Sequence, residues 1–128
     1  YFQSPTNQSS FSLVESTISH NHLLSGANGH GAGLYVGGNT GAAYKLVKFR
    51  PQVFVDHCNL SHNVLDTCTS STGSGVSLNM VDARFSNCSI QNNIAISDGY
   101  TQGGGINMMD GRLTFLSSHV SGTRATVR

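Results

Sequence analysis

The sequence predicts an all-β fold, a right-handed parallel β-helix (solenoid) of about three and a half repeats of ~30 residues each. Three observations predict it. The composition disfavours helices, one pattern of residues recurs along the chain, and apolar residues alternate with polar ones inside each copy.

The composition suits short strands joined by turns. Among 128 residues there are 15 Gly, and Ser, Thr and Asn are also abundant. All four compete with helical backbone hydrogen bonds. Only 10% of residues are charged and the net charge is +1, so no attraction to nucleic acid is indicated. No apolar run approaches the ~20 residues that span a bilayer, so we expect no direct membrane insertion of this stretch.

The repeat is anchored on four apolar residues at matching positions, Ile18, Leu60, Ile90 and Val120. Around each anchor, apolar residues lie five and seven positions earlier without gaps. The interval from the first anchor to the second is longer than the later ones, because the first repeat carries an insertion within residues 37–52. The fourth copy is about half a repeat.

Alternating apolar pairs indicate half-buried strands, three per repeat. Between them lie nine-residue segments, which we expect to be stacked loops, at 22–30, 64–72 and 94–102. Single repeats of this kind bury little, so they are expected to stack into one continuous interior. The parallel crossovers predict a right-handed winding.

Asn and Gly recur at the turns. Asn21, Asn63 and Asn93 follow the anchors by three residues, which predicts an asparagine ladder with left-handed backbone angles. The alternative, that these side chains bind a ligand, is less favoured. A G-x-G motif is expected to give backbone freedom at the next strand. Its glycines are Gly31, Gly33, Gly73, Gly75, Gly103 and Gly105.

The predicted core stack comprises the four anchors together with Cys58 and Cys88, which share an inward position on adjacent repeats. Free stacked thiols are favoured over a disulfide, because side chains on adjacent parallel strands point the same way with rather distant Cβ atoms. Cys68 falls in a loop without an obvious partner.

Two motifs carry a family resemblance. Phe85-Ser86-Asn87-Cys88 and Gly103-Gly104-Gly105-Ile106, with weaker copies in earlier repeats, resemble the repeats of chlamydial polymorphic outer-membrane proteins and related autotransporter passengers. Cys88 stands where that family usually has Asn. The resemblance implies an extracellular or cell-surface scaffold that is used for adhesion.

Candidate catalytic residues are few. Gly29-His30-Gly31 is similar to a motif of polygalacturonases, which need paired carboxylates as acid and base. Asp66 and Asp98 occupy equivalent loops and are the pair that could meet. His20 and His62 share a turn position, and metal binding there would need a third ligand such as His22 or His57. We predict a solvated turn position, no metal site and no cofactor.

Residues 1–4 match the end of a protease recognition site, so we interpret them as an expression scar outside the fold. Residues 5–128 are interpreted as a single module from a longer protein. Asn7, Asn59 and Asn87 begin N-x-S sequons, at a frequency that chance explains.

The insertion is the segment most suggestive of binding. It gathers basic and aromatic residues, and long loops on a regular scaffold often carry binding residues. A flanking strand or a cover for the core remains the alternative. The predicted binding residues are Tyr44, Lys45, Lys48, Phe49 and Arg50.

Together these features predict a non-catalytic extracellular scaffold that binds a protein or glycan at a cell surface. One alternative is a carbohydrate-active enzyme, either a polysaccharide lyase or hydrolase. Another is a structural module that self-associates end to end, because open stacks expose unpaired strand edges.

Overall fold

The computed structural model describes residues 2–3, 10–38 and 50–128. These residues form seventeen strands and no helix, so this part of the chain has no helix that could cross a membrane. Every strand pairing is parallel, and the pairs fall into four sheets. The predicted all-β class and the parallel pairing are confirmed.

The largest sheet, here called the long sheet, has six strands in the order β1-β6-β11-β7-β2, and β15 pairs with β11. Its strands are β1 (Phe2–Gln3), β2 (Ser10–Val14), β6 (Leu34–Gly37), β7 (Gln52–Asp56), β11 (Val76–Ser86) and β15 (Ile106–Leu116). The N-terminal half of β11 pairs with β6 and its C-terminal half with β7. The insertion therefore lies where later repeats have one continuous strand.

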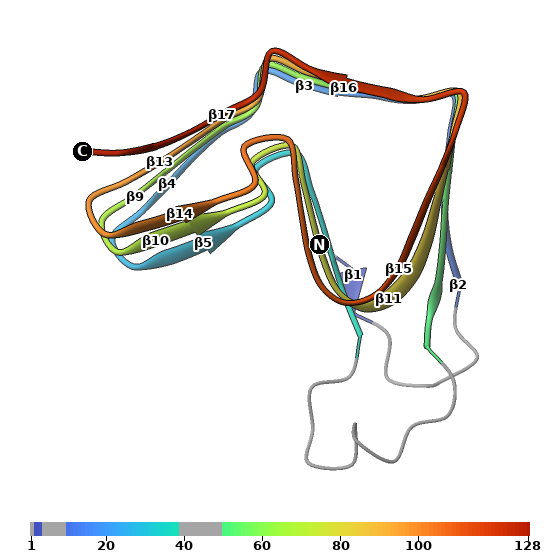
Figure 1. Ribbon diagram of the computed structural model, residues 1–128, viewed down its shortest axis with the longest axis horizontal. Helices are drawn as coiled ribbons and strands as arrows, with labels where there is room; N and C mark the ends of the chain where they lie inside the picture. The colour runs from blue at the N-terminus through green and yellow to red at the C-terminus, as the bar shows by residue number, and fades with distance from the viewer. Residues whose placement is uncertain (1, 4–9, 39–49) are drawn as a thin grey trace.

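A second sheet of four strands, the roof sheet, joins the upper end of the long sheet (Figure 1). It comprises β3 (Thr17–Ser19), β8 (Asn59–Ser61), β12 (Ser89–Gln91) and β16 (His119–Ser121). The four anchor residues lie side by side here, since Ile18 pairs with Leu60, Leu60 with Ile90 and Ile90 with Val120. Together the long sheet and the roof sheet enclose what we call the body.

Two further sheets form an arm that projects from the body, at the left of Figure 1. The outer arm sheet comprises β4 (His22–Ser25), β9 (Val64–Thr67), β13 (Ile94–Ser97) and β17 (Arg124–Val127). The inner arm sheet comprises β5 (Asn28–His30), β10 (Ser70–Thr72) and β14 (Tyr100–Gln102). The expectation that 22–30, 64–72 and 94–102 are loops is therefore wrong, because each segment is a pair of strands.

The physical reason for this error is the polarity of the arm interior. Thr67, Ser71 and Ser97 are almost completely buried in it beside Leu65 and Ala95. Small hydroxyl residues at inward positions hide the alternation of apolar and polar residues that identifies a strand. The prediction of three strands per repeat missed the two strands of the arm.

The body holds the hydrophobic core. Val53, Val55, Leu60, Leu78 and Phe85 are at most 1% exposed, and all belong to one contiguous cluster. Of the other predicted core residues, Cys58, Cys88 and Ile90 are buried and Ile18 is partly buried. Val120 is exposed, because no described strand lies beyond the last repeat to cover it.

The asparagine ladder runs along the junction of the roof sheet and the arm. The Nδ2 atom of Asn21 donates to Oδ1 of Asn63 at 2.9 Å, and Nδ2 of Asn63 donates to Oδ1 of Asn93 at 3.0 Å. The amides of Asn63 and Asn93 also donate to the carbonyls of Ile18 and Leu60. Asn63 and Asn93 are fully buried, and the ladder supplies their amide hydrogen bonds.

The left-handed backbone angles lie one residue earlier than expected. His20, His62 and Asn92 have φ between 52° and 57°, whereas the ladder asparagines are not among the residues with positive φ. The chain turns at the residue that points outward, which leaves the next side chain free to point into the ladder. The prediction that the ladder residues adopt this conformation is therefore wrong.

The two glycines of each G-x-G motif have different roles. Gly31, Gly73 and Gly103 have positive φ, as predicted. At Gly75 the reason is space, because an added Cβ would lie 2.4 Å from the Gly105 carbonyl oxygen and 2.8 Å from Nδ2 of Asn93. The second glycine therefore makes room for the ladder rather than supplying backbone freedom.

The N-terminal residues take part in the long sheet. Phe2–Gln3, expected to lie outside the fold, pair with Val36 and Gly37 as strand β1.

The three cysteines are free. Cys58 and Cys88 are buried, and Cys68 is exposed. Burial raises the pKa of the Cys58 thiol, and its Sγ lies 3.2 Å from the Asp56 carbonyl oxygen.

Candidate functional site

The predicted binding residues of the insertion are mostly outside the described residues, which leaves Tyr44, Lys45, Lys48 and Phe49 as a prediction. Arg50 is described, and its guanidinium forms an ion pair with Asp110 at 2.7 Å. Asp110 lies two repeats further along, at the bend of β15, where its φ is 58°. Arg50 thus ties the end of the insertion to the last repeat.

The outer face of the long sheet continues from this point. Outward-facing side chains of β7, β11 and β15 surround a hollow of about 230 Å³. We call this surface the cationic face, and its polar and aromatic residues are Gln52, Phe54, Asp82, Arg84, Arg112 and Thr114.

Phe54 is the aromatic centre of the cationic face. It stands at an outward position and is 45% exposed, although neighbouring Val53 and Val55 are buried. In the strand register Arg84 pairs with Phe54, and Thr114 pairs with Arg84. Adjacent strands lie about 4.8 Å apart, so an exposed ring and an exposed guanidinium stand next to each other.

Two of the five basic residues in the described part of the chain, Arg84 and Arg112, lie on the cationic face. Five of the seven basic residues are in the insertion or on the cationic face, namely Lys45, Lys48, Arg50, Arg84 and Arg112. Among the described residues, neither Arg84 nor Arg112 forms an ion pair. The nearest acid in the register is Asp82, whose Oδ1 accepts a hydrogen bond from the Arg112 backbone at 3.1 Å. Two guanidinium groups are therefore available to an anion.

The candidate catalytic pair, Asp66 and Asp98, does come together, through an arginine. Arg128 Nη2 lies 2.7 Å from Asp66 Oδ1, and Arg128 Nε lies 2.8 Å from Asp98 Oδ1. Desolvation opposes the charged form of Arg128, but these two carboxylates outweigh it and raise the pKa of the guanidinium. Both carboxylates are therefore paired with the same guanidinium.

The histidines form contacts with the chain itself. His20 and His62 stack with ring centroids 4.9 Å apart and an interplanar angle of 2°. His30, in the motif similar to that of polygalacturonases, contacts Thr72 and the ring of Tyr35. Across the described ranges, no three His, Cys, Asp or Glu side chains are grouped as a metal site would require.

A further small cluster lies at the corner between the long sheet and the roof sheet. Asp56 Oδ2 is 2.9 Å from His57 Nδ1, and Asn87 donates to Asp56 Oδ1 at 3.3 Å. The hydrogen bond from His57 is the main cause that lowers the pKa of Asp56. The sequon residues Asn59 and Asn87 are both exposed, and Asn7 is outside the described residues.

Sequence reasoning missed Phe54, Arg84 and Arg112. Their signal was weak but present, because all three occupy outward positions in strands where alternation predicts an exposed side chain. Alternation shows that a residue points outward, but it does not distinguish a solvated surface from a binding surface.

Comparison with known proteins adds no assignment. The chain matches no protein-family model, and the searches of curated proteins and of solved structures also gave no match. The resemblance to chlamydial polymorphic outer-membrane proteins stays a prediction that rests on the two short motifs.

Proposed function

We propose that this chain is a right-handed parallel β-helix at the cell surface or outside the cell. In this proposal it binds an acidic glycan without altering it chemically. The glycan lies on the cationic face. Four parallel sheets built from successive repeats support the β-helix, and the rarity of left-handed parallel crossovers supports its handedness.

One observation carries the binding proposal: exposed Phe54 and Arg84 stand side by side on a face that also carries Arg112. An aromatic ring offers a flat apolar surface to the C–H face of a sugar ring. A guanidinium pairs with a carboxylate or sulfate through two parallel hydrogen bonds. Thr114 and Gln52 add neutral hydrogen-bonding groups at the rim.

The regular spacing of the strands favours an extended chain as the ligand. Phe54, Arg84 and Thr114 follow one another across three paired strands in a straight row. The spacing between paired strands, about 4.8 Å, is similar to the length of one hexose unit, so successive sugars can meet successive strands.

The carboxylates support a non-catalytic role. Asp56 bonds His57, Asp66 and Asp98 share Arg128, and Asp110 pairs with Arg50. Glycoside hydrolysis needs two carboxyl groups that face the scissile bond, and these four are instead bound to basic side chains of the chain itself.

The test is binding of a sulfated glycan, heparin, compared with neutral dextran of similar length, measured by isothermal titration calorimetry. We expect heparin to bind with an affinity that falls as salt rises, and Arg84→Gln to weaken it about tenfold or more. Phe54→Ala should also weaken it. Arg124→Gln is the matched control, because it removes the same charge from the arm.

Equal binding of dextran and heparin would contradict the proposal, as would an equal loss from Arg124→Gln. Absence of any glycan binding would favour a protein partner on this face. The length of the glycan after incubation with the protein tests whether it is bound without cleavage. Shortened glycan chains would contradict a non-catalytic role.

A further inference from the structure

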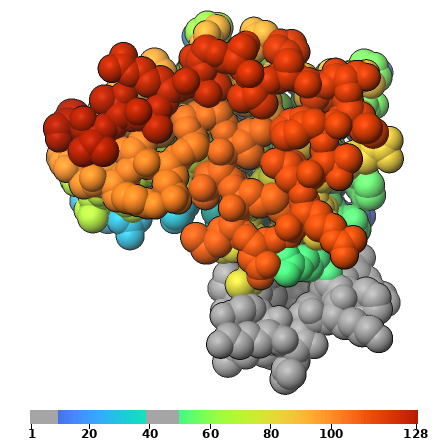
Figure 2. Space-filling view, viewed as in Figure 1, coloured from blue at the N-terminus to red at the C-terminus, as the bar shows by residue number. Residues whose placement is uncertain are grey.

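Both ends of the stack of repeats expose strand edges. At one end, the front end, each of β2, β3, β4 and β5 pairs with a single described strand. At the other, the back end, the same holds for β14, β15, β16 and β17. The back end faces the viewer in Figure 2, where the orange and red side chains of the last part of the chain form the surface. Such edges carry backbone donors and acceptors that can pair with another strand.

Apolar interior side chains are exposed at both ends. At the back end Phe115, Val120 and Val127 are 37%, 44% and 53% exposed. Their equivalents one repeat earlier, Phe85, Ile90 and Ser97, are fully buried. At the front end Leu23 is 40% exposed, whereas its register partner Leu65 is buried. These side chains are of the type that another repeat covers elsewhere in the stack.

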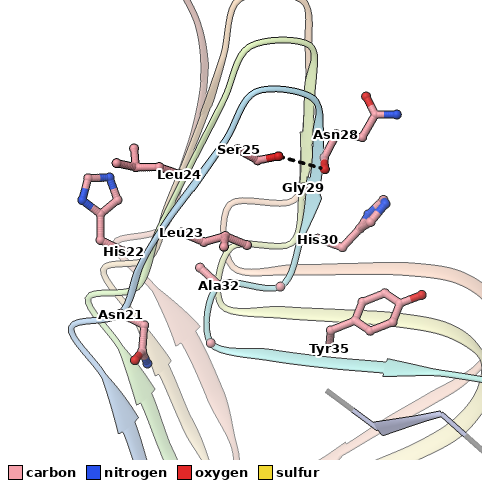
Figure 3. A pocket seen from close by; sticks show the side chains of 12 residues that line it. Asn21, His22, Leu23, Leu24, Ser25, Asn28, Gly29, His30, Ala32 and Tyr35 are labelled. Carbon is pink, nitrogen blue, oxygen red and sulfur yellow. Dashed lines mark hydrogen bonds between the residues drawn. The ribbon is translucent and has the colours of Figure 1, made fainter.

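The front end also has room to receive side chains. A hollow of about 780 Å³ opens there, at the edge of β4 and β5. Figure 3 shows Leu23 and Ala32 pointing into it, while His22 and Leu24 point away on one side and His30 and Tyr35 on the other. Gly29 lines it and adds no side chain.

The inward-facing side chains that the back end of the arm offers are small or apolar. If the register of the internal repeats continues, Ala125 faces Leu23, Val127 faces Ser25 and Thr101 faces Gly29. In the roof sheet Val120 would continue the row of Ile18, Leu60 and Ile90. No carboxylate of the described residues faces another carboxylate in this arrangement, so no repulsion between acids opposes it.

The hydrogen bonds of the internal junctions define the new ones. The backbone N–H of Asn59 donates to Ser16, that of Ser89 to Cys58 and that of His119 to Cys88, at 2.9 to 3.0 Å. The same geometry lets Thr17 of a second copy donate to the Ser118 carbonyl. At the end of the ladder, Thr123 replaces Asn, and its hydroxyl can donate to Oδ1 of Asn21 of that copy.

From these observations we propose that two copies of this chain associate head to tail, with the back end of one on the front end of the next in the register of the internal repeats. Such a contact joins two different surfaces and does not close, so it produces linear oligomers rather than a symmetric dimer. Strand β1 occupies the edge of β6 at Val36 and Gly37, which is where β15 of the next copy would pair. Removal of residues 1–4 should therefore strengthen the association.

Sedimentation velocity across the micromolar to millimolar range tests the proposal. The wild-type chain should form a concentration-dependent series of oligomers. Ile18→Lys, at the front end, and Val120→Lys, at the back end, should each weaken association about a hundredfold or more, because a lysine would be buried without a partner. Thr17→Lys and Ser121→Lys are matched controls, since both side chains are exposed on the outer side of the same strands.

A mixing experiment distinguishes head-to-tail contact from other association. The Ile18→Lys chain keeps its back end and the Val120→Lys chain keeps its front end, so an equal mixture should form a heterodimer and nothing larger. Circular dichroism establishes that each variant is folded before it is mixed.

A wild-type chain that stays monomeric at millimolar concentration overturns the proposal. So does a mixture in which the two folded variants do not pair, or a variant that still forms dimers alone. No glycan is present in these measurements, so their failure leaves the proposed binding function untouched, and the converse also holds.

Discussion

The body and the arm share one kind of backbone pairing, but their interiors differ in chemistry. In the body, Val55, Leu60 and Phe85 pack into one apolar cluster. In the arm, Leu65 and Ala95 alternate with Thr67 and Ser97, which are just as buried. Parallel pairing in a stack thus tolerates two interiors, one held by apolar burial and one that also depends on hydroxyl groups finding partners.

The difference affects stability because buried hydroxyls are favourable only when bonded. In the third repeat Ser97 Oγ donates to the Tyr100 carbonyl at 2.9 Å and lies 2.9 Å from Thr101 Oγ1. In the second repeat Thr67 Oγ1 and Ser71 Oγ are buried without a partner among the described residues. The arm should therefore be the less stable of the two regions.

The largest expected effect contrasts one deletion in each region. Phe85→Ala should lower the free energy of unfolding by about 3–5 kcal/mol, because it opens a cavity in the apolar cluster beside Phe115. Leu65→Ala should cost about 2 kcal/mol, at the low end for such a change, since the narrow arm can collapse around it. Urea denaturation followed by circular dichroism measures both, and an equal or larger loss for Leu65→Ala would remove the distinction.

The next effect concerns the ladder where the two regions join. Asn63→Ala should cost about 1–3 kcal/mol, because Asn21 and Asn93 each lose a buried partner. Asn21→Ala, at the exposed end, breaks one link and should cost less. Thermal unfolding of the two variants checks the order, and the opposite order would show that the ladder does not hold the junction.

Within the arm, the two hydroxyl environments predict opposite signs. Thr67→Val keeps the shape and removes an unpartnered hydroxyl, so it should be neutral or stabilise by up to about 1 kcal/mol. Ser97→Ala removes a bonded hydroxyl and should destabilise by about 1 kcal/mol. The melting temperatures of the two variants, compared with that of the wild-type chain, test both signs. A destabilised Thr67→Val chain would mean that this hydroxyl has a partner in solution.

The smallest effect is a difference in thiol reactivity with no change in stability. Cys68, exposed in the arm, should react rapidly with Ellman's reagent, while buried Cys58 reacts slowly. The raised pKa of Cys58 also lowers the fraction of its thiol that is ionised at a given pH. Its reaction rate should therefore begin to rise at a higher pH than that of an ordinary thiol. Cys68→Ser should abolish the rapid phase, and a rapid phase that persists would place Cys58 or Cys88 at the surface.

The sequence predicted the parallel stacking well because it repeats at fixed offsets. Ile18, Leu60 and Ile90 align without gaps, and the strand register pairs the same residues. The ladder was equally visible, since Asn recurs three residues after each of the first three anchors. Periodicity carries such information because every repeat must place the same residue above its neighbour.

Other features could not be predicted for physical reasons. The arm was missed because Ser and Thr occupy its inward positions. The left-handed corners were misplaced because His20, His62 and Asn92 adopt them, rather than the ladder asparagines that follow. The contacts of Arg50 with Asp110 and of Arg128 with Asp66 join residues two repeats apart through long side chains, and no local pattern records them.

The asparagine ladder has a consequence for how such a chain can change its length. Asn63 receives a hydrogen bond from the repeat before it and donates one to the repeat after it, through the same side chain. A segment such as 82–111 carries Asn93 and Gly105, and Gly105 lies beside Thr123 of the next repeat as Gly75 lies beside Asn93. The segment therefore makes the same kind of contact with the repeat before it and with the repeat after it. Duplication or loss of that segment would preserve every junction, which lets evolution or an engineer lengthen the molecule in whole steps without redesigning its interior.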